Sequence, residues 1–100
     1  MDLVDLIVEK KDAIKLTCAK YGAKAVRIFG SCARDDYNEK SDIDVLVQME
    51  REPSGFKYFA RLADLEDELK KLLGVDVDVV DETGLKGRMR DRVLKEAVSL

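Results

Sequence analysis

The stretch GSCARDDYNEKSDIDVLV, residues 30–47, places a Gly-Ser pair ten residues before an Asp-Ile-Asp that opens a run of β-forming residues. Residues 42–48 alternate with the period of two that is typical of a strand, so Asp42 and Asp44 share one face and aliphatic side chains share the other. Carboxylates are poor strand formers and are costly to bury without a partner. The two acids therefore either face water or meet something positively charged.

The sequence around this stretch predicts a small α/β protein. Apolar residues recur at helical spacing in three segments, although Lys10 and Lys11 interrupt the first, and Gly22 and Gly74 follow two of them as helix ends. Leu85, Met89, Val93 and Ala97 define the apolar side of the last helix. We expect helices at 2–21, at 54–73 with Ser54 after Pro53 as N-cap, and at 85–98, strands at 24–29, 42–48 and 75–80, and one helical turn at the start of 31–40.

The expected order is α-β-(α)-β-α-β-α, which packs as a small mixed β-sheet with flanking helices in a single domain over residues 1–100. The chain is 46% hydrophobic and 39% charged, and its net charge of −3 argues against a nucleic-acid-binding module. A single nucleotide stays compatible with this charge, because a bound metal ion supplies local positive charge. With no stretch near 18 apolar residues and no secretory segment, we expect a cytoplasmic protein without membrane contact.

The absence of histidine restricts the chemistry that this chain can perform. Zinc sites and Ser-His or Cys-His nucleophiles need histidine or several cysteines, and the chain has no histidine and two cysteines without ligand spacing. Any catalysis must therefore use carboxylates, Lys, Arg, backbone amides and a metal bound through oxygen.

The Asp-x-Asp pattern occurs twice, at Asp42 and Asp44 and at Asp76 and Asp78, each time within a Val-rich strand. One interpretation is that charges on exposed or edge strands discourage association between sheets. The other is a metal site, because Asp42 and Asp44 are rooted roughly 6.6 Å apart along a strand. A third carboxylate from a neighbouring strand, Asp76 or Asp78, would complete an oxygen-only site suited to Mg²⁺.

Beside such a metal site, the Gly-Ser pair becomes a candidate phosphate-binding turn. Gly30 ends a predicted strand and Ser31 begins a short helix, and a turn of this kind presents backbone N–H groups to phosphate. Arg34, one turn further on, is placed to reach a phosphate oxygen, although alone it would be read as a solvated cation. Phosphate donors, two strand acids and a third acid together match the requirements of in-line nucleotidyl transfer.

The combination of GS, ten residues, DID followed by VLV, and a later VDVVDETGL resembles the minimal nucleotidyltransferases of the DNA polymerase β superfamily. Within them it is most similar to MntA-type antitoxins, which pair with HEPN-domain HepT toxins. The resemblance implies a polymerase-β-like core in which Gly30 and Ser31 contact the triphosphate and Asp42 and Asp44 bind Mg²⁺, with two ions expected. The third acid aligns best as Asp78.

The implied reaction is transfer of AMP from ATP to a tyrosine hydroxyl of the toxin, which blocks its ribonuclease activity. The sequence departs from the family in having Asp35 and Asp36 after Arg34, where glycine is common. No segment for a primer or a second substrate is recognisable, so we expect substrate choice to come from the partner chain.

Three other functions remain open on the sequence. The chain could be a non-catalytic antitoxin that covers the toxin sterically, or a purely structural partner whose apolar helix stripes form an interface. It could also transfer nucleotides to RNA or to a small molecule. Acidic pI disfavours RNA, and a small molecule would need a pocket beside ATP.

Overall fold

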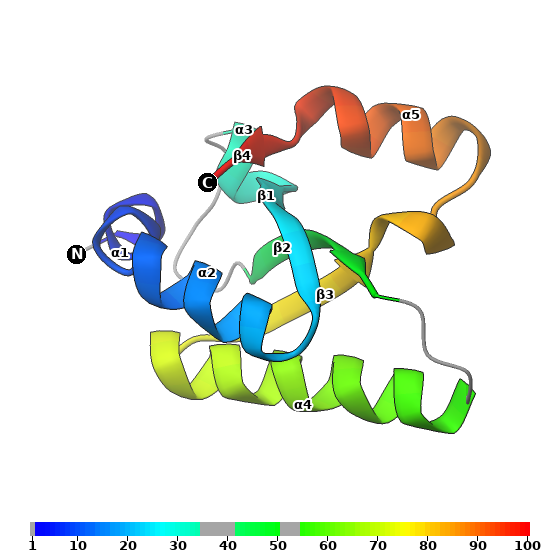
Figure 1. The fold of residues 1–100 in the computed structure, drawn as a ribbon. Coiled ribbons are helices and arrows are strands. Elements are labelled where there is room, and N and C mark those ends of the chain that lie inside the picture. The colour runs from blue at the N-terminus through cyan, green and yellow to red at the C-terminus, as the bar shows by residue number, and fades with distance from the viewer. Residues whose placement is uncertain (1, 35–41, 51–54) are drawn as a thin grey trace.

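The computed structural model describes residues 2–34, 42–50 and 55–100, in which a four-stranded sheet carries helices on both faces (Figure 1). The strands lie in the order β3-β2-β1-β4, with β2 parallel to β3 and the other two pairs antiparallel. The predicted small mixed α/β architecture is confirmed. The strands are β1 (Ala23–Phe29), β2 (Ile43–Met49), β3 (Val77–Asp81) and β4 (Val98–Ser99).

Helices α1, α2 and α4 cover one face of the sheet, and α5 covers the other (Figure 1). The short α3 follows β1, and a single 3-10 turn, η1, follows β3. No helix within the described ranges combines the length and apolarity that a membrane span requires. The helical elements are α1 (Leu3–Glu9), α2 (Lys11–Lys20), α3 (Ser31–Arg34), α4 (Gly55–Leu73), η1 (Glu82–Gly84) and α5 (Gly87–Glu96).

The main core lies between the sheet and the helices α1, α2 and α4. Leu65 and Leu69 of α4 are fully buried against Val45 and Val47 of β2, as the helical stripe predicts. Burying side chains of this size contributes about 1.5–3 kcal/mol each relative to exposure. The helix ends at Gly74, whose φ of +69° is the left-handed conformation that glycine adopts without strain. The predicted N-cap Ser54, with Pro53, lies outside the described residues.

A second, smaller core lies under α5. Leu46 is fully buried there together with Leu85 and Val93. Leu46 shares its face of β2 with Asp44, so this face is apolar where α5 covers it and acidic toward the start of the strand. The predicted acids Asp44 and Asp78 therefore lie at the end of the sheet where β2 and β3 begin.

The predicted helix over 2–21 is interrupted at Lys10, which separates α1 from α2. Lys10 leaves the helical conformation at φ −96° and ψ 9°, while its N–H still bonds the Leu6 carbonyl. The break falls at the lysines that interrupt the apolar stripe, and it allows Ile7 and Ile14 to be buried from two separate helices. Gly22, with φ +75°, follows the end of α2 as predicted.

The prediction of the C-terminal helix is wrong at its end. The helix stops at Glu96, and Val98–Ser99 form β4, which pairs with Arg27 and Ile28 of β1. Ala97 turns to an extended conformation and lets the chain add an edge strand, a long-range pairing that helical periodicity cannot reveal. The strand expected at 75–80 is found at Val77–Asp81 instead, although the Asp76 carbonyl already accepts the Ile43 N–H at 3.0 Å.

Candidate active site

Two of the predicted acids lie side by side on the parallel strands. Asp44 of β2 is the register partner of Asp78 of β3. Asp42 precedes β2 by one residue and lies two positions before Asp44, so the alternation of a strand sends both carboxylates to the same face. Asp44 is half-buried, whereas Asp42 and Asp78 are exposed. Parallel pairing therefore gathers three carboxylates at one end of the sheet.

The electrostatics of Asp44 reflect this gathering. Burial, followed by the negative charges of Asp78 and Asp42, raises its pKa from 3.8 to about 6. Glu96 adds to the increase, and the guanidinium of Arg34 opposes it. A carboxylate surrounded by like charges gains strongly from a bound cation, which would relieve the repulsion.

The structure also separates Asp78 from Asp76. Asp76 immediately precedes β3 and Asp78 lies within it, and both are exposed. Asp78 is the register partner of Asp44 and is among the charges that raise the pKa of Asp44. Asp76 is not among those charges, and its backbone carbonyl is engaged by Ile43. Asp78 is therefore the acid that the fold brings beside Asp44.

Gly30 lies against the same carboxylate. Its φ is +72°, and a Cβ placed on it would lie 2.1 Å from Oδ2 of Asp44, far inside van der Waals contact. The Gly30 carbonyl accepts the N–H groups of Ala33 and Arg34 at 3.1 Å, which forms the single turn of α3 with Ser31 as its first residue. Only glycine allows the turn and the acid to approach so closely.

Mg²⁺ is the metal that the resemblance to the minimal nucleotidyltransferases implies for these residues. The side chains that gather here supply carboxylate oxygens, the ligands that Mg²⁺ prefers, and their mutual repulsion favours a cation. Over 2–34, 42–50 and 55–100, no three Asp, Glu, Cys or His side chains are already grouped tightly enough to enclose an ion. Mg²⁺ usually keeps several waters and binds through one or two protein carboxylates plus substrate phosphates, so this donor set fits.

Glu96 contacts the predicted site residues Gly30 and Arg34, and no pattern in the sequence predicts this contact. It is the last residue of α5, yet its carboxylate accepts the Gly30 N–H at 3.3 Å and the Arg34 guanidinium at 3.2 and 3.3 Å. Glu96 lies 62 residues from Arg34 along the chain, so no local pattern marks it. Asp35 and Asp36, where the sequence departs from the family pattern after Arg34, lie outside the described residues.

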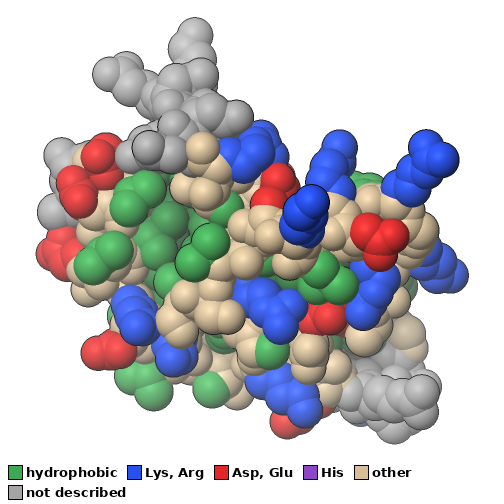
Figure 2. Space-filling view, turned by 90° about the horizontal axis from the view of Figure 1, so that it is seen from above, with side chains coloured by type: hydrophobic (Ala, Val, Ile, Leu, Met, Phe, Trp, Pro, Cys, Tyr) green, Lys and Arg blue, Asp and Glu red, His purple; other side chains and the backbone are tan. Residues whose placement is uncertain are grey.

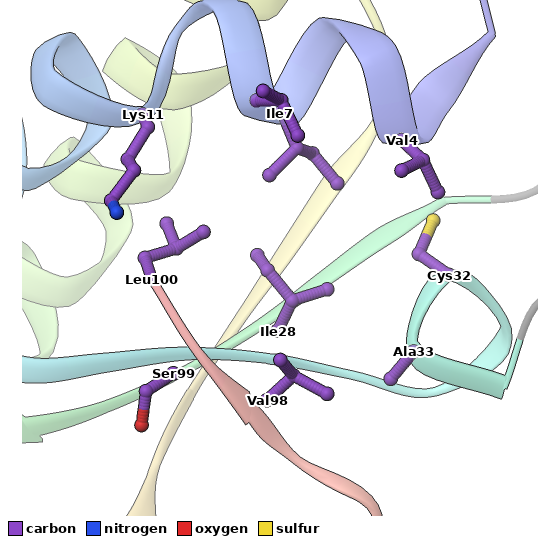
Figure 3. Close-up of a pocket in the computed structure, with 10 residues that line it drawn as sticks. Val4, Ile7, Lys11, Ile28, Cys32, Ala33, Val98, Ser99 and Leu100 are labelled. Carbon is purple, nitrogen blue, oxygen red and sulfur yellow. The ribbon is translucent and has the colours of Figure 1, made fainter.

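The face of the molecule that carries α5 has a basic part and an apolar part. Figure 2 shows Lys and Arg side chains over the part formed by α5 and hydrophobic side chains over the part nearer α1 and β4. An apolar pocket of about 340 Å³ opens between α1, α3, β1 and β4, with Ile7, Ile28 and Val98 pointing into it (Figure 3). None of its lining residues is a predicted site residue, so this pocket is distinct from the acids.

Comparison with known proteins assigns the chain to a family. The nucleotidyltransferase domain model matches residues 10–100. A protein of Methanocaldococcus jannaschii, provisionally named a protein adenylyltransferase, is 37% identical over 97 residues, which cover 97% of this chain and 88% of that protein. The protein adenylyltransferase MntA of Thermococcus cleftensis is 38% identical over 79 residues, covering 79% of this chain and 76% of MntA.

Solved structures agree with this assignment. One, provisionally described as a minimal nucleotidyltransferase, superposes with a TM-score of 0.82 at 41% identity, over 100% of this chain and 97% of that chain. A toxin–antitoxin crystal structure with AMP-PNP has a TM-score of 0.67 and covers 98% of this chain and 72% of that one. At 18% identity the second match shows a common fold alone. With the family match over residues 10–100 and these relatives, the chain belongs to the minimal nucleotidyltransferase family, whose members include MntA.

Proposed function

We propose that residues 1–100 form one catalytic domain that transfers AMP from ATP, with Mg²⁺, to a tyrosine of a HEPN-domain toxin and thereby neutralises it in the cytoplasm. The observation that carries the proposal is the register of Asp44 with Asp78, beside the Gly30 turn. The two relatives described above both bear the name protein adenylyltransferase, one of them provisionally. Toxin–antitoxin crystal structures share the fold, including one with AMP-PNP.

In this proposal Asp42, Asp44 and Asp78 hold the metal. Bound Mg²⁺ would neutralise negative charge at the α-phosphate and at the leaving diphosphate. The backbone N–H of Gly30, the Ser31 hydroxyl and the Arg34 guanidinium orient the triphosphate, because all three are hydrogen-bond donors at one turn.

The transfer needs no nucleophile on this chain. The tyrosine oxygen forms a bond to the α-phosphorus, and the bond from that phosphorus to the diphosphate breaks. Asp78 is exposed, so an incoming hydroxyl from another chain can reach its carboxylate. Asp78 orients this hydroxyl and accepts its proton, the role of a general base.

The test is the intact mass of a co-expressed HEPN-domain toxin after incubation with this protein, ATP and Mg²⁺. We expect the toxin to gain mass in AMP-sized steps. Asp78→Asn should abolish the gain, because it removes a metal ligand and the proton acceptor. Asp76→Asn is the matched control, since it makes the same chemical change two residues away and away from Asp44.

The outcomes separate the alternatives. A mass gain that survives Asp78→Asn would refute the assigned roles. No gain, together with a stable complex, would make the chain an antitoxin that acts by steric cover alone. Neither gain nor complex would show that the partner is wrong, and radiolabelled ATP with other acceptors would then identify the substrate.

A further inference from the structure

Glu96 contacts the groups that the proposed function assigns to the triphosphate. Its side chain is only 18% exposed, and it accepts hydrogen bonds from the Gly30 N–H and from the Arg34 guanidinium. Carboxylate and phosphate oxygens are acceptors of the same kind, and both pair well with Arg and with backbone N–H groups. Glu96 thus satisfies, from within the protein, donors that would otherwise point at a ligand.

The Glu96 carboxylate and a phosphate oxygen cannot both accept the Gly30 N–H at the same time. A guanidinium has five N–H groups and can serve more than one acceptor, but a backbone amide has a single N–H. A phosphate oxygen bound to Gly30 must therefore displace the Glu96 carboxylate. The Glu96 side chain can rotate away while the backbone keeps its position. The backbone is held there because the Ala97 N–H donates to the Val93 carbonyl at 2.9 Å and β4 pairs with β1.

Charge acts in the same direction as this competition. The negative charge of Glu96 contributes to the raised pKa of Asp44, so its carboxylate lies within electrostatic reach of the acids. A triphosphate entering the site meets this fourth carboxylate as well as Asp42 and Asp78. Removing the Glu96 charge should favour an incoming anion even where no contact is made.

We infer that Glu96 sets the nucleotide affinity of this protein: its carboxylate occupies the donors of Gly30 and Arg34 in the nucleotide-free state, and the triphosphate binds by displacing it. The inference rests on the proposed function in one respect, that the Gly30 turn receives phosphate. It adds a residue from the far end of the chain that opposes binding while it stabilises the free protein.

The decisive variant is Glu96→Gln, which keeps an acceptor of the same shape and removes the charge. The matched control is Asp91→Asn, which makes the same change in net charge at an exposed position of α5. The Kd values of Mg²⁺·AMP-PNP and Mg²⁺·diphosphate are measured by calorimetry, and thermal unfolding is followed without ligand. Glu96→Ala, which removes the acceptor entirely, serves as a second variant if the first folds poorly.

Both Glu96 variants should bind the two probes about twofold to fivefold more tightly than the wild type, the scale of a partly exposed ion pair. Their Tm without ligand should fall, because the contacts to Arg34 and Gly30 weaken. Asp91→Asn should keep the wild-type Kd. A purely structural role for Glu96 predicts that affinity and Tm fall together.

Equal or weaker binding by the Glu96 variants, with normal binding by the wild type, would overturn the inference and leave the proposed function intact. Tighter binding by Asp91→Asn to the same extent would also overturn it, because the effect would then reflect net charge. No binding of either probe to any variant would refute both. Tighter binding without AMP transfer to any acceptor would support the inference and refute the proposed reaction.

Discussion

Replacing Asp44 by asparagine should stabilise the metal-free protein while it removes a proposed metal ligand. Asparagine has nearly the shape of aspartate but no charge, so it avoids the burial cost and the repulsion from Asp78 and Asp42 that raise the pKa of Asp44 to about 6. The increase of the Asp44 pKa from 3.8 to about 6 corresponds to about 3 kcal/mol, because a change of one in pKa is 1.36 kcal/mol. Asp44 is only half-buried, and screening by solvent reduces this to about 1–2 kcal/mol.

The pH dependence follows from the direction of the shift. Between pH 3.8 and about 6 the folded protein binds the Asp44 proton more tightly than the unfolded chain does, so Asp44 lowers stability as the pH rises through this window. Below this window the carboxyl is neutral in both states and the variant should match the wild type. Above about pH 7 the full difference of about 1–2 kcal/mol should be present.

The assay is urea denaturation of both proteins in EDTA at several pH values from 3 to 8, where the pair at pH 3, below the window, serves as an internal control. Adding Mg²⁺ at pH 7.5 should stabilise the wild type more than the variant, because a ligand that binds the native state raises its stability. A variant that is less stable than the wild type at pH 7.5 would refute the reasoning, as would a stability difference that does not change with pH.

Two further predictions concern the turn and the end of β3. Gly30→Ala should cost at least 1–2 kcal/mol more in urea denaturation than Gly74→Ala, and should abolish AMP-PNP binding. Both glycines have positive φ, but only the Cβ at Gly30 would collide with Asp44; equal losses would contradict the collision. Tyr58→Phe should lower stability by about 1–3 kcal/mol without affecting AMP transfer, because Asp81 is buried and accepts the Tyr58 hydroxyl at 2.5 Å. An unchanged urea midpoint would show that water replaces the lost donor.

Much of the secondary structure could be predicted because its signals are local. The alternation in residues 42–48 located β2 and placed Asp42 and Asp44 on one face, and the stripe through Leu65 and Leu69 located α4. Predictions failed where a long-range contact overrides the local pattern. Val98 is the last residue of the helix predicted at 85–98 but pairs with Ile28 in the structure.

By itself, the sequence determined the chemistry that is possible: no histidine, carboxylates in Val-rich strands, and a Gly-Ser turn with an arginine behind it. These features depend on residue type and on spacings shorter than one element. The tertiary structure alone decided that Asp78, and not Asp76, lies beside Asp44, because only the register of two parallel strands joined through α4 makes that choice. It alone brought Glu96 onto Gly30, 66 residues apart, since packing of α5 on the sheet and pairing of β4 with β1 set that contact.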